Sequence, residues 1–218
     1  MIGRIRRIFA ACREVRQIPV GRQVCGTLLL LLFGIVSGVF AKFLDTTPAN
    51  VLPRVLEVLD IRNVLGRFAV WELTALCIAV YSSRALRASL NVFVFFAGML
   101  AGYYVYTAAA GEIVSVSYVM VWVGFTLLSL PLAALCWYAK GACGLSFALS
   151  AVILAFLFWS SFVYGIWYFA ALSLPEALAF GCGAVVLRRK TLKMTALLLA
   201  CGIALGLILG LLIPFSFG

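Results

Sequence analysis

The sequence predicts an all-α polytopic transmembrane helical bundle of about seven spans, and three observations support this prediction. Two-thirds of the 218 residues are hydrophobic and only 11% are charged, whereas a water-soluble domain of this length needs a more polar surface. The apolar residues form long continuous runs, which favour helices over the short alternating strands of a β-barrel. Lysine and arginine concentrate in alternate connections, as in multi-pass proteins.

The chain begins with a basic segment, residues 1–23, which holds six arginines and one glutamate. We expect this segment to be cytoplasmic, because anionic lipids of the inner leaflet attract basic residues. A cleaved signal peptide is the competing interpretation. The apolar run that follows is long and no small-x-small site ends it, so we expect an uncleaved first span within a single transmembrane domain, residues 24–218.

The first span covers residues 24–41 and is followed by residues 42–67, the largest polar connection. Apolar residues recur there at helical spacing, with charged residues between them, so we expect an extracytoplasmic amphipathic loop. Two interpretations remain for this loop: a connector on the membrane surface, or a lid over a cavity.

Six further apolar runs complete the predicted bundle, over residues 68–81, 90–110, 118–138, 145–164, 170–187 and 192–213. Each is read as a helix long enough, or nearly long enough, to cross the hydrocarbon core. Only a short turn separates the fifth and sixth spans, so a six-span bundle is the rival interpretation.

Glycines at a spacing of four mark helix faces that a neighbouring helix can approach closely. They form one pair in the first span, one pair in the third span, and a glycine-zipper ridge in the last span: Gly34, Gly38, Gly98, Gly102, Gly202, Gly206 and Gly210. We expect these residues to pack helices together, within this chain or against a partner.

The basic residues also predict the orientation. In the seven-span arrangement, 13 lysines and arginines lie on the side of the N-terminus and four lie on the other side. By the positive-inside rule the N-terminus is cytoplasmic and the C-terminus is outside. The prediction is a multi-pass protein of the bacterial cytoplasmic membrane.

Two carboxylates lie near the outer ends of predicted spans, Glu72 in the second and Glu176 in the sixth. A carboxylate within a span is costly unless it is paired, protonated or hydrated. Aromatic residues lie at the same level: Tyr103, Tyr104, Tyr106, Trp122 and Trp167. Carboxylates beside aromatic faces suit an organic cation or a flat polar ring, so these seven residues are the candidate ligand site. The alternative is an interfacial aromatic belt, with Glu72 neutralised by Arg62 or Arg67.

Composition also argues against other kinds of chemistry. Histidine is absent, which removes the commonest general base and metal ligand. The seven cysteines show no C-x-x-C pairing and are read as buried apolar residues, not as disulfides or metal ligands. No nucleotide-binding loop or nucleophile elbow is present. We therefore expect no enzyme, no catalytic residue, no metal or cofactor, and no nucleic-acid partner.

Three patches resemble a family of small bacterial multi-spanning membrane proteins of unknown function. They are Lys42-Phe43-Leu44-Asp45 with Pro48, then Asn91-Val92-Phe93 leading into Gly98-Met99, and the stretch from Cys136 to Gly141. In organisation, the chain is also similar to the substrate-binding membrane subunits of energy-coupling-factor transporters, which are typically six-span. That resemblance implies an outer cavity covered by the loop after the first span, and helix faces for a partner subunit.

Together these features predict a transporter, or the membrane subunit of a transport system, that recognises a small organic ligand from the outer side. The ligand class is cationic or aromatic. Besides the lipid bilayer, the expected partners are a small-molecule ligand and either a membrane partner subunit or further copies of this chain. The alternative is a non-transporting immunity or assembly factor that acts through helix–helix contacts.

Overall fold

The computed structural model describes residues 12–48, 51–165 and 167–213. Of the predicted basic segment, residues 1–11 lie outside this range. Within it, five helices are long and apolar enough to cross a membrane: α2 (Val20–Thr46), α6 (Ala85–Ala109), α7 (Val116–Ala139), α8 (Gly144–Ser161) and α10 (Leu192–Leu212). The predicted class, a helical multi-pass membrane bundle, is confirmed.

Two shorter apolar helices, α5 (Ala69–Tyr81) and α9 (Leu174–Leu187), form where the second and sixth spans were predicted. They have 13 and 14 residues, so each is only about 20 Å long at about 1.5 Å per residue. The hydrocarbon core is about 30 Å thick. Length alone therefore leaves the prediction of seven spans open.

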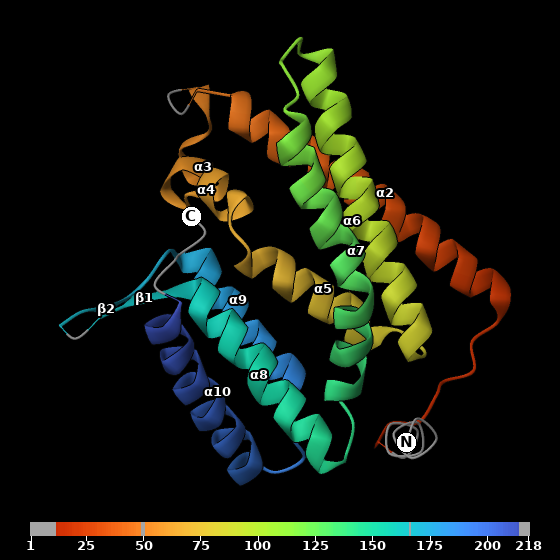
Figure 1. The fold of residues 1–218 in the computed structure, drawn as a ribbon, viewed down its shortest axis with the longest axis vertical. Coiled ribbons are helices and arrows are strands. Elements are labelled where there is room, and N and C mark those ends of the chain that lie inside the picture. Colours follow the sequence, from red (N-terminus) through yellow and green to blue (C-terminus); the bar gives the residue numbers. More distant parts are fainter. Residues whose placement is uncertain (1–11, 49–50, 166, 214–218) are drawn as a thin grey trace.

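Helix α5 is the centre of the bundle. It contacts α6 and α7 on one side and α8 and α9 on the other, so it separates two groups of helices (Figure 1). In one group α2 packs on α6, which packs on α7, and in the other α10 packs on α8. A core of leucines joins α5 to the second group through Leu76, Leu154 and Leu198.

The crossing of α2 and α6 is closest where their glycine pairs meet. A Cβ on Gly34 or Gly38 would overlap the backbone of Phe95 or Met99, and one on Gly102 would overlap the backbone of Ile35. A Cβ on Gly98 would lie 2.7 Å from the carbonyl oxygen of Leu31 in α2. The two backbones touch because neither helix carries side-chain bulk at these positions.

The glycine ridge of α10 faces α8 in the same chain. A Cβ on Gly202 or Gly206 would meet Leu154 or Phe158, and one on Gly210 would meet the hydroxyl of Tyr164. The ridge is therefore covered within the chain.

The helical spacing of apolar residues over 42–67 does not produce one continuous helix. The segment instead contains two short helices, α3 (Arg54–Val58) and α4 (Ile61–Gly66). Pro53 is the N-cap residue of α3. Asp60 separates the two helices in a left-handed conformation with φ of 53°, which a continuous α-helix cannot accommodate.

The predicted boundary between the fifth and sixth spans is also wrong. Helix α8 ends at Ser161, and a hairpin of β1 (Phe162–Tyr164) and β2 (Phe169–Ala171) follows, with Phe162 paired to Ala171. Aromatic and β-branched residues favour strands. Helix α9 begins only after Ser173, with Pro175 in its first turn, where proline costs no hydrogen bond.

Candidate functional site

Glu176 is fully buried and forms an ion pair with Arg67. It lies in the first turn of α9 and has no solvent-exposed area. Arg67 directly follows α4, and its Nη1 donates to both carboxylate oxygens, Oε1 at 3.2 Å and Oε2 at 3.1 Å. The side chain of Arg67 is 18% exposed. Such a charge-assisted pair is the usual way to accommodate a carboxylate away from water.

Glu72 lies in the first turn of α5, the helix that packs beside α9. Its Oε2 accepts a hydrogen bond of 2.9 Å from the hydroxyl of Ser160 in α8. Among the described residues no lysine or arginine forms an ion pair with Glu72. The alternative interpretation paired Glu72 with Arg62 or Arg67, but Arg67 binds Glu176 and Arg62 donates to the backbone carbonyl of Asp45.

Two hydroxyl groups of the same region have no hydrogen-bond partner in the described part of the chain. They are Ser161 at the end of α8, which is fully buried, and the buried Oγ of Ser173, the N-cap residue of α9. Their chain segments are adjacent, since the amide of Leu172 donates to the carbonyl of Ser161. A buried hydroxyl without a partner costs about 1–3 kcal/mol, so such groups are usually satisfied by a water, an ion or a bound molecule.

Helix α4 packs against this region, where it contacts α2, α5 and α9. We call the α3–α4 segment the cover. Asp60, at the junction of α3 and α4, accepts a hydrogen bond from Asn63 and lies 3.9 Å from Nη2 of Arg67. Movement of the α3–α4 segment would therefore carry Arg67 with it. We call Arg67, Glu72, Ser160, Ser161, Ser173 and Glu176 the acidic cluster.

The five aromatic residues of the predicted site are not gathered at the acidic cluster. Trp122 of α7 stacks on Phe68, the residue after Arg67, with ring centroids 6.0 Å apart. Trp167 lies at the tip of the β1–β2 hairpin and is 93% exposed. Of the five, Trp122 is thus linked to the cluster through one neighbour, and Trp167 points away from the bundle.

The three tyrosines lie at the far end of α6. Tyr103 donates to Oδ2 of Asp45 at 3.2 Å, and the buried Lys42 lies over its ring. Lys42 also binds Glu112 at 2.7 Å. The ring of Tyr104 packs on Tyr103, and its buried hydroxyl has no partner in the described part of the chain. This second charged group is formed by α2 and the connection between α6 and α7, and it was not foreseen from the sequence.

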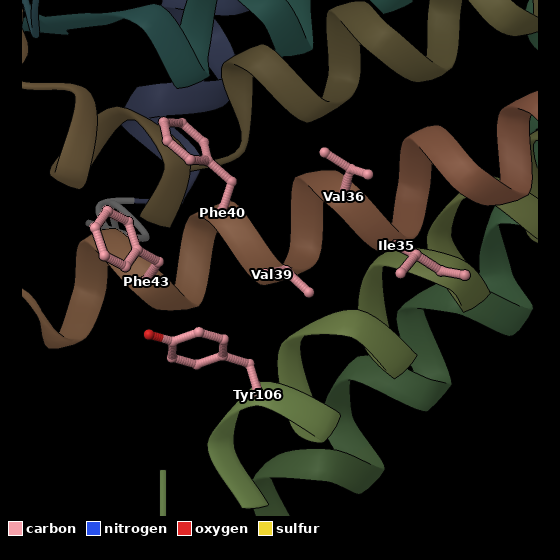
Figure 2. A pocket seen from close by; sticks show the side chains of 6 residues that line it. All are labelled: Ile35, Val36, Val39, Phe40, Phe43 and Tyr106. Carbon is pink, nitrogen blue, oxygen red and sulfur yellow. The ribbon is translucent and has the colours of Figure 1, made fainter. Parts of the chain in front are cut away.

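Tyr106 faces α2 across an open apolar groove of about 360 Å³. Figure 2 shows its ring opposite side chains of α2; the groove is lined by Ile35, Val36, Val39, Phe40, Phe43 and Tyr106. A second hollow of about 220 Å³ lies on the 52–63 segment. Neither of these two spaces is lined by a residue of the acidic cluster.

At the opposite end of the bundle, basic side chains cap the C-terminal carbonyls of three helices. Arg13 donates to Val80 of α5 and Trp137 of α7, each at 2.6 Å, and Lys140 donates to Val186 of α9. Burial lowers the pKa of Lys140 below its usual value, and the charges of Arg188, Arg189 and Arg13 lower it further. Cations at these positions complement the helix dipoles.

The expectation that the cysteines form no disulfide is wrong for one pair. Cys12 and Cys143 are bonded across 131 residues of sequence, between the N-terminal segment and the connection from α7 to α8. The sequence offered no C-x-x-C signal because only the fold brings these two residues together. Among the described residues no group of three metal-ligating side chains occurs.

No family model matches this chain, and no match was found among curated proteins or solved structures. The family resemblances therefore stay expectations.

Proposed function

We propose that this chain is a membrane transport protein, or the membrane subunit of a transport system, that recognises a small organic cation from the outer side at the acidic cluster. One observation carries the proposal: the cluster holds two carboxylates, Glu72 and Glu176, but one guanidinium, Arg67. A carboxylate within the bundle that has no cationic partner, as Glu72 has none among the described residues, favours a bound cation or a proton.

In this proposal Arg67 is an internal cation that stabilises the closed arrangement of the cover. Its guanidinium binds the carboxylate of Glu176. Arg67 is also the C-cap residue of α4, so it moves with the cover. If the cover moves outward, Glu176 loses its partner. An amine or guanidine ligand compensates for that loss, so cation binding and opening of the cover favour each other.

The orphaned hydroxyls of Ser161 and Ser173 supply acceptors for the N–H groups of such a ligand. Trp122 and Phe68 lie at the edge of the cluster, where an aromatic face attracts a cation. Of the tyrosines of α6, Tyr103 contacts the separate group around Lys42, Tyr104 packs on Tyr103, and Tyr106 lines the apolar groove beside α2.

The proposal includes seven membrane-crossing helices in a bacterial cytoplasmic membrane, with the N-terminus inside. Helices α5 and α9 then start at the acidic cluster, below the outer interface, and end at the basic inner side. At the inner end, Arg13 and Lys140 donate hydrogen bonds to the last carbonyls of these two short helices. At the outer end, α4 of the cover packs against both helices.

The alternative is a non-transporting interaction protein that acts through helix–helix contacts; its contact surface would lie outside the glycine ridge, which meets α8 and Tyr164 within this chain.

Thermal unfolding of the purified chain in lipid nanodiscs, with a panel of cations, tests the proposal. The panel consists of alkylamines, alkylguanidines and tetramethylammonium, with the matching alcohols as neutral controls. We expect at least one cation class to raise the unfolding midpoint in a saturable way, because ligands that bind only the folded state stabilise it. Glu72→Gln should abolish the shift, whereas Glu112→Gln, at the Lys42 group, should retain it. A panel without any shift in the wild type, or a shift that survives Glu72→Gln, would contradict the proposed site.

A further inference from the structure

The N-terminal segment forms a strap across the basic end of the bundle. Besides the Cys12–Cys143 disulfide, the amide of Ala142 donates to the carbonyl of Cys12 at 2.9 Å, and the amide of Arg16 donates to the carbonyl of Ser83 at 3.0 Å. We call residues 12–18 the strap. It connects the α7–α8 connection with the α5–α6 connection.

Arg13 fastens the strap to the ends of two helices. Its two terminal nitrogens bind the carbonyls of Trp137 and Val80, and its guanidinium lies 4.6 Å from the centroid of the Trp137 ring. Val80 is in the last turn of α5, the helix whose first turn carries Glu72. The strap is thus attached directly to the central helix of the acidic cluster.

The sulfur of Cys143 lies in an electropositive part of the bundle. Cys143 is the N-cap residue of α8, where the aligned peptide dipoles place positive charge. Its Sγ lies 3.2 Å from the hydroxyl of Ser146, and Arg189 binds the carbonyl of Gly141 two residues earlier. Arg13 and Lys140 add positive charge at this end, and Glu14 is the acidic residue of the strap. A stabilised thiolate is a good leaving group, so a disulfide to such a cysteine exchanges readily.

Access differs between the two cysteines. Cys12 is 4% exposed, whereas Cys143 is half-buried and follows the exposed Ala142. Exchange breaks the bond whichever sulfur is attacked, but attack on the more buried Cys12 Sγ is the one that releases Cys143 as the leaving thiolate. A small thiol therefore suits this site better than a protein-sized reductant does, unless the strap first opens.

We propose that Cys12 and Cys143 form a reversible redox clasp that fixes the strap to the inner end of α5. A low-molecular-weight thiol such as glutathione attacks one sulfur, the other leaves as a thiolate, and a mixed disulfide forms. A second thiol molecule then attacks the small-thiol sulfur of the mixed disulfide. The remaining cysteine leaves as a thiolate, and the two small thiols form their oxidised disulfide. The net reaction converts one protein disulfide and two thiols into two protein thiols and one small disulfide.

The cytoplasmic role of this clasp rests on the orientation included in the proposed function. A stable disulfide is uncommon in the cytosol, so an inside location makes this pair a sensor of oxidation and not a permanent cross-link. The clasp chemistry itself depends only on the pair and its surroundings.

Two measurements on the full chain in nanodiscs test the clasp. The first is equilibration with mixtures of reduced and oxidised glutathione, followed by alkylation and counting of free thiols by mass spectrometry. We expect two additional thiols to appear as reduced glutathione is raised to millimolar concentration, and to disappear again in oxidised glutathione. Cys182→Ser, which removes an exposed free cysteine of α9, should behave like the wild type apart from one thiol fewer.

The second measurement is trypsin cleavage after Arg13, relative to cleavage after the exposed Arg16. In the oxidised chain Arg13 is held by its carbonyl partners. Reduction should raise the relative cleavage rate after Arg13 at least about tenfold. The reason is that a cross-link over a long loop favours the attached strap over the released strap by more than a factor of ten. Cys12→Ser and Cys143→Ser should show the fast rate in both buffers.

A pair that stays oxidised in the folded chain under millimolar thiol would overturn the clasp, as would a pair that never oxidises. Equal cleavage after Arg13 in both states would also overturn it. Labelling of intact cells with a membrane-impermeant maleimide keeps the two proposals apart. Labelling of Cys143 from outside, with reversible exchange in nanodiscs, would refute the orientation and leave the clasp standing.

Discussion

Replacing Arg67 by glutamine tests the acidic cluster most directly. The substitution leaves the carboxylate of Glu176, which has no exposed area, without its positive partner. Removal of one member of a buried ion pair costs about 3–5 kcal/mol, because the remaining charge stays uncompensated. For a chain of this length that corresponds to a fall in the unfolding midpoint of roughly 6–20 °C. Glu176→Gln should also destabilise the chain, since it leaves Arg67 partly buried without its carboxylate.

The informative result is the double variant, Arg67→Gln with Glu176→Gln. Two neutral amides can hydrogen-bond to each other, so we expect the double variant to recover most of the loss caused by Arg67→Gln alone. Unfolding midpoints of all four proteins in nanodiscs form the double-mutant cycle. Arg62→Gln is the matched control, because Arg62 is exposed and binds one backbone carbonyl. Additive effects of less than about 1 kcal/mol each, as at solvated surface pairs, would refute the buried, cation-dependent site.

Two further predictions concern packing and charge. Gly38→Leu should separate α2 from α6 and destabilise the chain by about 1–3 kcal/mol, whereas Gly26→Leu, which meets nothing within 4 Å, should not; equal unfolding midpoints of the two variants would contradict the close crossing. The lowered pKa of Lys140 means that the unfolded chain binds this proton more tightly, so stability should rise as the pH approaches the usual lysine pKa of about 10.4. Lys140→Gln should flatten that rise, and an unchanged pH profile of the unfolding midpoint would contradict it.

The helices could be located from hydrophobicity because apolar runs of this length have few other stable arrangements in a membrane. Failures came where local and tertiary effects compete. Residues 42–67 have a helical pattern, yet Asp60 breaks it with a left-handed backbone. Residues 162–171 continue the apolar run of α8, yet they pair as a hairpin, because apolar character alone does not distinguish a strand from a helix.

The candidate site was foreseen in part. Glu72 and Glu176 stood out because carboxylates are rare in spans, and both lie at the starts of adjacent helices. Their partners could not be foreseen: Arg67 and Ser160 are 109 and 88 residues away in sequence. The aromatic residues share a level along the membrane normal, but a shared level does not specify which helix faces which, and the fold directs Tyr103 and Trp167 elsewhere.

By itself, therefore, the sequence determined that this chain is a helical membrane protein, since the cost of placing unpaired backbone and charge in lipid depends on composition and run length. Which carboxylate receives a guanidinium, which glycine faces meet, and which two of seven cysteines bond were decided by the tertiary structure alone. Each of these depends on the relative rotation of helices far apart in sequence. In lipid that rotation is set by close packing and polar pairing, which no single helix specifies.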